Sequence, residues 1–448
     1  MTERKPRSFF VITLPILVFS AFLTEVRFIP SLANNVGLFE VLGALIIGLF
    51  FLSPDREALA GNSVIWIIGL CVVVASASLI NVQTGMLVTG AIQVSILVFL
   101  FFFLFVSYNL FLSRQISPGY ILRWITISAA IVGPWILRQG FLFTSNLEAV
   151  GPFRNRSHMG IYMLTTFWLV LVYTFWPSRA RDKWTKIPVC LVALSLCLYA
   201  VAISGRRSVY LSLFIGLVGL VLVFTLVLQR RRATVAVVLA FAIGFLGLLY
   251  TKGQDFLPRS EFFQNRVGMI GSRLRSATDA VTGASQEGFM ALQMQGITAA
   301  LSSHPILGIG WGTFHEWSFN PSRHEVHSTP LKFLAETGVV GLAIYLALLY
   351  RIVFGAGRLA IRMRGSPYAG SYLVLAVAIS SLSISYLYNR HLTERTFWLL
   401  LLVFLILEAF SFGYERSRLE AAPEGTRTSG IRRPGSGQLE AAAGHDRA

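Results

Sequence analysis

The sequence predicts an all-α, polytopic membrane protein: a helical bundle of about 12 transmembrane helices, with one large extracytoplasmic loop between the ninth and tenth. Two observations predict this fold class. Hydrophobic residues make up 55% of the 448 residues and charged residues only 13%, which is about half the charged share of a typical soluble protein. Apolar runs of about 20 residues, the length that crosses a bilayer, recur along the whole chain.

The predicted spans follow from these apolar runs. They fall at 9–26, 36–52, 63–80, 86–112, 121–137, 158–176, 188–204, 208–228, 233–250, 329–350, 368–388 and 396–413. The chain therefore divides into nine helices within 1–250, the loop at 251–328, three helices within 329–413, and a polar tail at 414–448. We expect the tail to be disordered, because it has too little apolar content to form a core.

Lysines and arginines indicate the orientation of the bundle. They cluster at the N-terminus, at 179–186, at 230–232, at 351–364 and in the tail, all on the N-terminal side of the predicted bundle. Because cytoplasmic loops are enriched in these residues, this side and both termini are expected to be cytoplasmic. The same loops explain the net charge of +17, so we expect membrane lipid and no nucleic acid as a partner.

The stretch 251–328 is too long for a passive connection, and it falls on the extracytoplasmic side. It contains a predicted amphipathic helix near 287–303 and a glycine-rich turn at 308–312. It also holds His327, at the mouth of the tenth helix, where a rigid element can position an imidazole as a general base. A metal site is the alternative, although the spacing of its candidate ligands matches no specific metal motif. These are His315, Glu316, His324, Glu325 and His327.

Arginines also lie where the positive-inside rule does not predict them. The extracytoplasmic connections carry Arg138, Arg154, Arg156, Arg206, Arg207, Arg266, Arg273, Arg275, Arg323, Arg390 and Arg395. Arg206 and Arg207 occupy a tight turn between two apolar stretches, at or just inside the expected bilayer surface. They either extend to lipid phosphates or form an anion site, since a guanidinium can hold phosphate oxygens bidentately.

A second basic motif comes directly before the sixth helix, on the same face. It contains Arg154, Asn155, Arg156 and His158. Asn155 and His158 either cap the following helix or, with the two arginines, help to hold a diphosphate at the helix N-terminus.

Four motifs, in order, resemble those of the O-antigen ligase and O-antigen polymerase superfamily. His327-Ser328-x-x-Leu331-x-x-Leu334-x-Glu336-x-Gly338-x-x-Gly341-Leu342 is similar to its His-Asn-x-x-Leu-x-x-Leu-x-Glu-x-Gly-x-x-Gly-Leu signature. The other three are the segments beginning at Pro305, Ser204 and Gly151. Two positions depart from the family pattern, because Ser328 replaces the usual Asn and Gly205 replaces the usual Ser.

The resemblance implies a membrane glycosyltransferase that uses neither a metal nor another cofactor. Such enzymes take a glycan from undecaprenyl diphosphate on the periplasmic face of the bacterial inner membrane. Ligases pass it to lipid A–core and polymerases pass it to another glycan, and the sequence leaves these two acceptors open. It also leaves open the sugar and the oligomeric state.

By the same resemblance, His327 is the general base and Arg206 the main diphosphate ligand, with Arg207 as its neighbour or substitute. Many members carry a further arginine in the helix before Pro305, and here Arg273 or Arg275 would supply that charge. Arg154 and Arg156 complete the expected donor site. The expected supporting residues are Asn155, His158 and Glu336.

Two other classes of function remain. A transporter or flippase would use the arginines to line a pathway, but no inverted repeat is visible and the polar groups gather on one face. A scaffold subunit of a polysaccharide assembly complex would use the large loop for docking. The gathering of polar groups at one surface favours catalysis there.

Overall fold

The structure is a computed structural model of the chain. It describes residues 9–21, 38–52, 61–113, 117–142, 156–178, 180–204, 207–227, 287–318, 320, 326, 328–388 and 395–420. The chain divides into two units, Met1–Ile406 and Leu407–Ala448. The helices and contacts described below lie in the first unit, apart from the end of the last helix.

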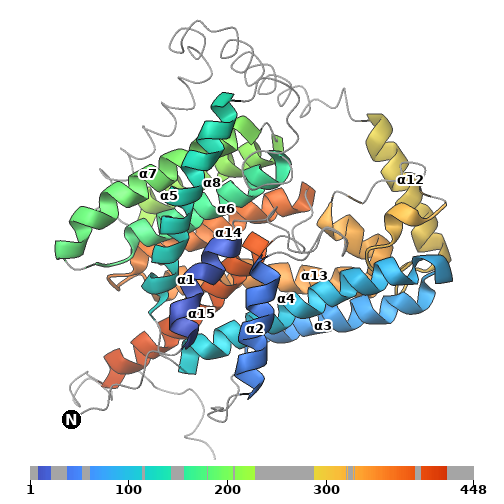
Figure 1. The fold of residues 1–448 in the computed structure, drawn as a ribbon, viewed down its shortest axis with the longest axis horizontal. Coiled ribbons are helices and arrows are strands. Elements are labelled where there is room, and N and C mark those ends of the chain that lie inside the picture. Colours follow the sequence, from blue (N-terminus) through green and yellow to red (C-terminus); the bar gives the residue numbers. More distant parts are fainter. Residues whose placement is uncertain are drawn as a thin grey trace, which may run out of the picture. The chain divides into compact units, whose positions relative to one another are not determined.

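All regular secondary structure in the described ranges is helical (Figure 1). The α-helices are α1 (Phe9–Ala21), α2 (Leu38–Leu52), α3 (Ser63–Ala77), α4 (Leu87–Ser113), α5 (Pro118–Leu142), α6 (Arg156–Phe175), α7 (Ala180–Ser204), α8 (Arg207–Val227), α12 (Glu287–Ser303), α13 (Thr329–Arg362), α14 (Ala369–Tyr388) and α15 (Arg395–Glu420). Short 3-10 helices are η1 (Ser78–Asn81), η2 (Thr84–Met86) and η4 (Phe314–Glu316). The all-α fold class is therefore confirmed.

Seven of the described helices contain segments long and apolar enough to cross a membrane. They are Ser63–Asn81, Thr84–Leu112, Pro118–Leu137, Asp182–Ala202, Thr329–Arg362, Ala369–Leu387 and Arg395–Ser417. Shorter apolar helices occur at Phe39–Leu52, Met159–Phe175 and Ser208–Phe224. Every predicted span except 233–250 overlaps a described helix, and 233–250 lies outside the described ranges. The total of about 12 spans therefore stays a prediction.

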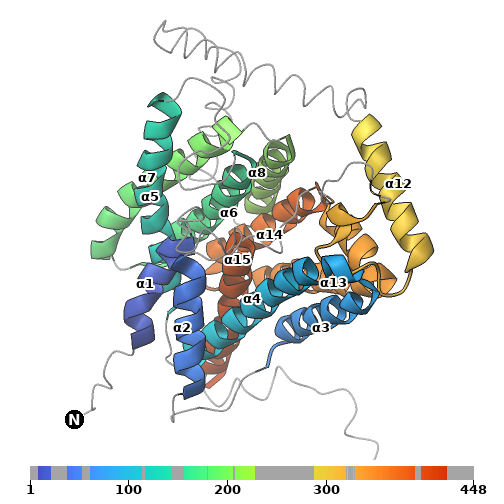
Figure 2. The same cartoon turned by 45° about the vertical axis from the view of Figure 1, so that its right-hand side comes forward.

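The large loop is described from α12 onward. The helix expected near 287–303 is present as α12, which packs on α13 (Figure 1 and Figure 2). In α12, Gln293, Ile297 and Ala300 are buried while Met294 and Thr298 are exposed, as the predicted amphipathic pattern requires. The part of the loop between 251 and 286 lies outside the described residues.

Helix α13 is longer than the apolar run at 329–350 predicts, and it continues to Arg362. Beyond position 350, Ile352, Ala356 and Leu359 are buried at helical spacing. This buried stripe continues the helix through the basic cluster, so Arg351, Arg358 and Arg362 lie on a helix and not in a loop.

A break at Gly338 divides α13. This glycine has a φ of 67° and a ψ of −165°, outside the helical region. The part that follows, 339–362, spans roughly 36 Å at the helical rise, which is enough to cross a hydrocarbon layer of about 30 Å. The head of α13, residues 329–337, is therefore not needed for the crossing and is available to support a site.

Contacts between helix ends fit a bundle of alternating helices. After the C-terminal end of α6, the ring of Trp176 lies 4.7 Å from that of Tyr368, just before α14. At the opposite end of α6, Gly160 contacts Ser204 at the end of α7. The start of α14 thus lies at the C-terminal end of α6, and the end of α7 lies at its N-terminal end, which fits the predicted alternation of helix directions.

Arg395 is one of the arginines that the positive-inside rule does not predict, and the structure explains it. Its Nε and Nη2 donate to the two carboxylate oxygens of Glu40, at 2.8 and 2.7 Å. This bidentate ion pair joins the first turns of α15 and α2. Arg395 is therefore accounted for by the fold.

Candidate active site

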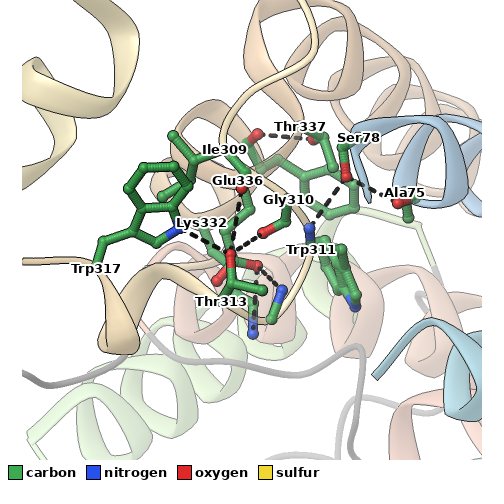
Figure 3. Close-up of polar contacts among 12 residues, drawn as sticks. Ala75, Ser78, Ile309, Gly310, Trp311, Thr313, Trp317, Lys332, Glu336 and Thr337 are labelled. Carbon is green, nitrogen blue, oxygen red and sulfur yellow. Dashed lines mark hydrogen bonds and ion pairs between the residues drawn. The ribbon is translucent and has the colours of Figure 1, made fainter. Parts of the chain in front are cut away.

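The glycine-rich loop at 304–314 lies directly on the break in α13 (Figure 3). In an uninterrupted helix the N–H groups of Val339 and Val340 would bond to carbonyls four residues earlier. Here the Val339 N–H donates to the Pro305 carbonyl at 3.0 Å, and the Val340 N–H donates to the Ile306 carbonyl at 3.4 Å. The loop thus supplies acceptors for both donors that the break releases.

The loop also supplies donors for the two carbonyls on the other side of the break. The Ile309 N–H donates to the Ala335 carbonyl at 3.1 Å, and the Gly310 N–H donates to the Glu336 carbonyl at 3.0 Å. These two carbonyls are the acceptors that Val339 and Val340 would use in a continuous helix. The backbone of the loop therefore replaces both interrupted helical hydrogen bonds, which satisfies the requirement that buried backbone groups be paired.

Two glycines allow this close approach. A Cβ on Gly308, which has a φ of 68°, would lie 2.3 Å from the carbonyl carbon of Glu336. A Cβ on Gly338 would lie 2.2 Å from the carbonyl oxygen of Ile306. In both cases the obstacle is backbone, so the neighbour cannot move aside as a side chain could. Gly308 and Gly338, one from each motif, are therefore explained by one contact between loop and helix.

Glu336 adds a side-chain link between the same two segments. Its side chain is 0% exposed, and its Oε2 accepts a hydrogen bond from the Gly312 N–H at 2.8 Å. The Nζ of Lys332 lies 3.7 Å from the same oxygen and 5.0 Å from the centroid of the Trp311 ring. Glu336, expected as a supporting residue, thus holds the glycine-rich turn on the head of α13 (Figure 3).

The loop is also tied to the end of α3. The Trp311 N–H donates to Ser78 Oγ at 3.0 Å, and Asn81 Nδ2 donates to the Gly308 carbonyl at 2.7 Å. These partners are more than 200 residues apart in the sequence. The glycine-rich turn is therefore held from two directions, by α13 and by the segment that follows α3.

His327 itself lies outside the described residues, but its neighbours on both sides are held. Val326 is fully buried in an apolar cluster. The cluster is formed by Ile297, Ala300, Ile309, Phe314, Trp317, Val326 and Ala335. On the other side, the Ser328 carbonyl accepts the Lys332 N–H at 2.8 Å, and α13 begins at Thr329 as expected. The candidate base therefore falls between two anchored residues.

The structure brings together the helix ends that flank the two arginine motifs. Arg156 is the first residue of α6, and Arg207 is the first residue of α8. A Cβ on Gly160 would lie 2.6 Å from the Cβ of Ser204 and 3.5 Å from Val209 Cγ2, so this turn of α6 fits against the end of α7 and the start of α8. The hydroxyl of Tyr210 donates to the Ala202 carbonyl, which joins the start of α8 to the last turn of α7.

The remaining predicted site residues lie outside the described part of the chain. These are Arg154, Asn155, Arg206, Arg273 and Arg275, together with the side chains of Arg156, His158 and Arg207. Their contacts with a donor stay predictions. No three His, Cys, Asp or Glu side chains gather among the residues that were described, and the alternative metal ligands His324, Glu325 and His327 lie beyond them.

Sequence reasoning missed Lys332, Ser78 and Asn81 as parts of this site. Lys332 carried a usable signal: a lone lysine in an apolar stretch, four residues before a glutamate, predicts an ion pair on one helix face. Ser78 and Asn81 carried no comparable signal, because they are ordinary polar residues at the end of a predicted span. Only the fold places them against the glycine-rich loop.

Residues 191–346 match a protein-family model described as O-antigen ligase. This segment belongs to the O-antigen ligase superfamily. The O-antigen ligase segment includes the Arg206–Arg207 turn, the glycine-rich loop and the head of α13. No curated protein matches the chain. The matched family is of the glycosyltransferase type, and the long apolar helices of the chain indicate a membrane protein.

Proposed function

We propose that the chain transfers a glycan from undecaprenyl diphosphate to a hydroxyl of lipid A–core, on the periplasmic face of a bacterial inner membrane. The observation that supports this most directly is the support of His327. The residues on both sides of it are anchored, and the glycine-rich loop is bonded to the broken helix next to it. A general base needs such a rigid support to meet its substrate at hydrogen-bond distance.

In the proposed reaction the acceptor hydroxyl oxygen attacks the anomeric carbon of the donor sugar. The bond from that carbon to the diphosphate oxygen breaks, and the lipid diphosphate leaves with the electron pair. His327 takes the hydroxyl proton. Arg206, with Arg207, stabilises the charge that develops on the leaving diphosphate, and the neighbouring Arg154 and Arg156 are expected to extend this clamp. Arg273 or Arg275 would contribute from the large loop.

The base is tested by a transfer assay in proteoliposomes with the lipid-linked donor. His327→Ala should lower the rate of transfer by about 10²–10⁴-fold, the usual contribution of a positioned general base. His445→Ala, which removes a histidine from the predicted tail, is the matched control and should transfer normally. Undiminished transfer by His327→Ala would exclude His327 as the base.

Donor binding in the same preparation tests the arginine clamp. Arg206→Ala should weaken binding of the donor by about tenfold or more, because a bidentate contact to phosphate is lost. Arg358→Ala, which removes an arginine from the far part of α13, is the control. If Arg206→Ala and Arg207→Ala both bind the donor normally, the clamp assignment is wrong.

A polymerase of the same superfamily would use the same donor and the same base. The two acceptors are distinguished by the surface glycans of a deletion strain. Long glycan chains left on the lipid carrier indicate a missing ligase, whereas a single repeat unit on lipid A–core indicates a missing polymerase. Movement of a labelled donor across the membrane without a covalent product would indicate a transporter.

A further inference from the structure

A lysine and a glutamate are buried together in the head of α13. Lys332 and Glu336 are one helical turn apart, and their side chains are only 6% and 0% exposed. Lys332 Nζ lies 3.7 Å from Glu336 Oε2, and it faces the Trp311 ring of the glycine-rich loop. Charged side chains this deeply buried are rare unless they are paired, because removal from water disfavours the charged form.

The pair stabilises the contact between loop and helix. Glu336 Oε2 accepts the Gly312 N–H, while Oε1 has no hydrogen-bond partner among the residues described. The Lys332 ammonium is the cation beside this carboxylate, and the backbone N–H groups of Gly312 and Phe314 also favour its charged form. If either charge is removed, the other is left buried and uncompensated, whereas removal of both leaves a neutral site.

The same part of α13 holds the residues on both sides of His327. The Lys332 N–H bonds to the Ser328 carbonyl, and Ala335 lies in the apolar cluster that buries Val326. Ala335 also accepts a hydrogen bond from the glycine-rich loop. A disturbance of the loop–helix contact would therefore reach Val326 and Ser328, the described residues on either side of His327.

We infer that Lys332 is a positioning residue for glycan transfer: paired with Glu336, it fixes the loop on α13 and so orients His327. This inference rests on the proposed function, in which His327 is the base. Lys332 does not need to contact the substrate, because it acts through the backbone on both sides of His327.

The positioning is tested without any reliance on activity. A cysteine is introduced by His327→Cys and its labelling by a membrane-impermeant maleimide is timed in the full chain. The native Cys71, Cys190 and Cys197 are buried and provide a low background. Lys332→Met and Glu336→Gln should each change the labelling rate by about tenfold, a typical size for coupled neighbours.

Three further variants identify the cause of such a change. Lys332→Arg, which keeps the charge, and the double variant Lys332→Met/Glu336→Gln, which removes both charges, should label within about threefold of the parent. Lys183→Met removes an exposed lysine from α7 and should have no effect. Parent-like labelling in both single variants would overturn the inference.

The transfer assay, with His327 retained, then distinguishes a positioning role of Lys332 from a direct role in the reaction. Each single variant should lower kcat by about tenfold with the KM for donor unchanged, and the double variant should recover kcat. A folded double variant with parent-like labelling but no transfer would overturn positioning, because Lys332 would then act on the reaction itself. If the single variants do not fold, labelling and kcat are measured in the double variant alone. Parent-like values of both support the positioning role, and parent-like labelling without transfer contradicts it.

The two proposals fail in different ways. Undiminished transfer by His327→Ala contradicts the base assignment and leaves the labelling result standing. Unchanged labelling contradicts the positioning role of Lys332 and leaves the base assignment standing.

Discussion

At the scale of single residues, Gly308 and Glu336 carry the contact between the glycine-rich loop and α13. Gly308 is required because backbone atoms of Glu336 and Thr337 occupy the space of a Cβ. Glu336 is required because its carboxylate accepts the Gly312 N–H inside a buried site. The two positions serve the same contact, one by the absence of a side chain and the other by accepting a hydrogen bond.

Gly308→Ala tests the close approach. It should lower the free energy of unfolding by about 2–4 kcal/mol, because the new Cβ meets backbone and the residue must keep a positive φ. The measurement is thermal unfolding in detergent. Gly357→Ala is the control on α13, where nothing lies within 4 Å of the new Cβ. It should be neutral or stabilising by roughly 0.5–1 kcal/mol. An unchanged unfolding temperature for Gly308→Ala would contradict the contact.

At the scale of elements, the arrangement of α6, α7 and α8 positions the proposed donor site. The first turns of α6 and α8 follow the two arginine motifs, and Gly160 of α6 lies against Ser204 at the end of α7 and Val209 at the start of α8. Helix N-termini favour anions, because their free N–H groups and their dipoles point toward the ligand. Two such ends with arginines beside them suit a diphosphate.

Gly160→Val tests this arrangement. The larger side chain would press on Ser204 and Val209 and displace the Arg206 turn, so donor binding should weaken by about tenfold. The measurement is donor binding in proteoliposomes. Gly219→Ala in α8 is the control, since its Cβ would meet only Val377, at an ordinary 3.7 Å. Normal donor binding by a folded Gly160→Val chain would show that this packing does not position the arginines.

At the scale of the whole molecule, the basic clusters predict the orientation in the membrane. The predicted cytoplasmic side includes the start of α7, and the predicted periplasmic side includes α12. The contacts between helix ends agree with this orientation. The C-terminal end of α6 and the start of α14 would both lie on the cytoplasmic side, and the start of α6 and the end of α7 would both lie on the periplasmic side.

Cysteine labelling in intact cells tests this orientation. Ser302→Cys on α12 should react with a membrane-impermeant maleimide, whereas Thr185→Cys on α7 should react only after the membrane is opened. Both positions are exposed, and the native cysteines are buried. Labelling of Thr185→Cys in sealed cells would reverse the predicted orientation.

The sequence alone determined the fold class, the approximate position of each described helix and the family motifs. The fold class, helix positions and motifs depend on local properties, because apolar runs and glycine spacings can be identified directly in the sequence. It placed α12 correctly, and it predicted Glu336 as a supporting residue of the site. It placed the end of α13 too early, because the buried stripe beyond position 350 is interrupted by arginines that resemble a loop.

The contacts between the motifs could be found only from the tertiary fold. Gly308 of the loop and Gly338 of α13 are 30 residues apart, and each is required because the backbone of the other segment lies against it. Ser78 and Asn81 hold the loop from more than 200 residues away. Such pairings depend on which chain segments meet in space, and hydropathy and local spacing carry no information about that. The proposed role of the buried Lys332–Glu336 pair depends on the fold for the same reason. The pair can hold the glycine-rich loop only because the fold brings that loop onto this turn of α13.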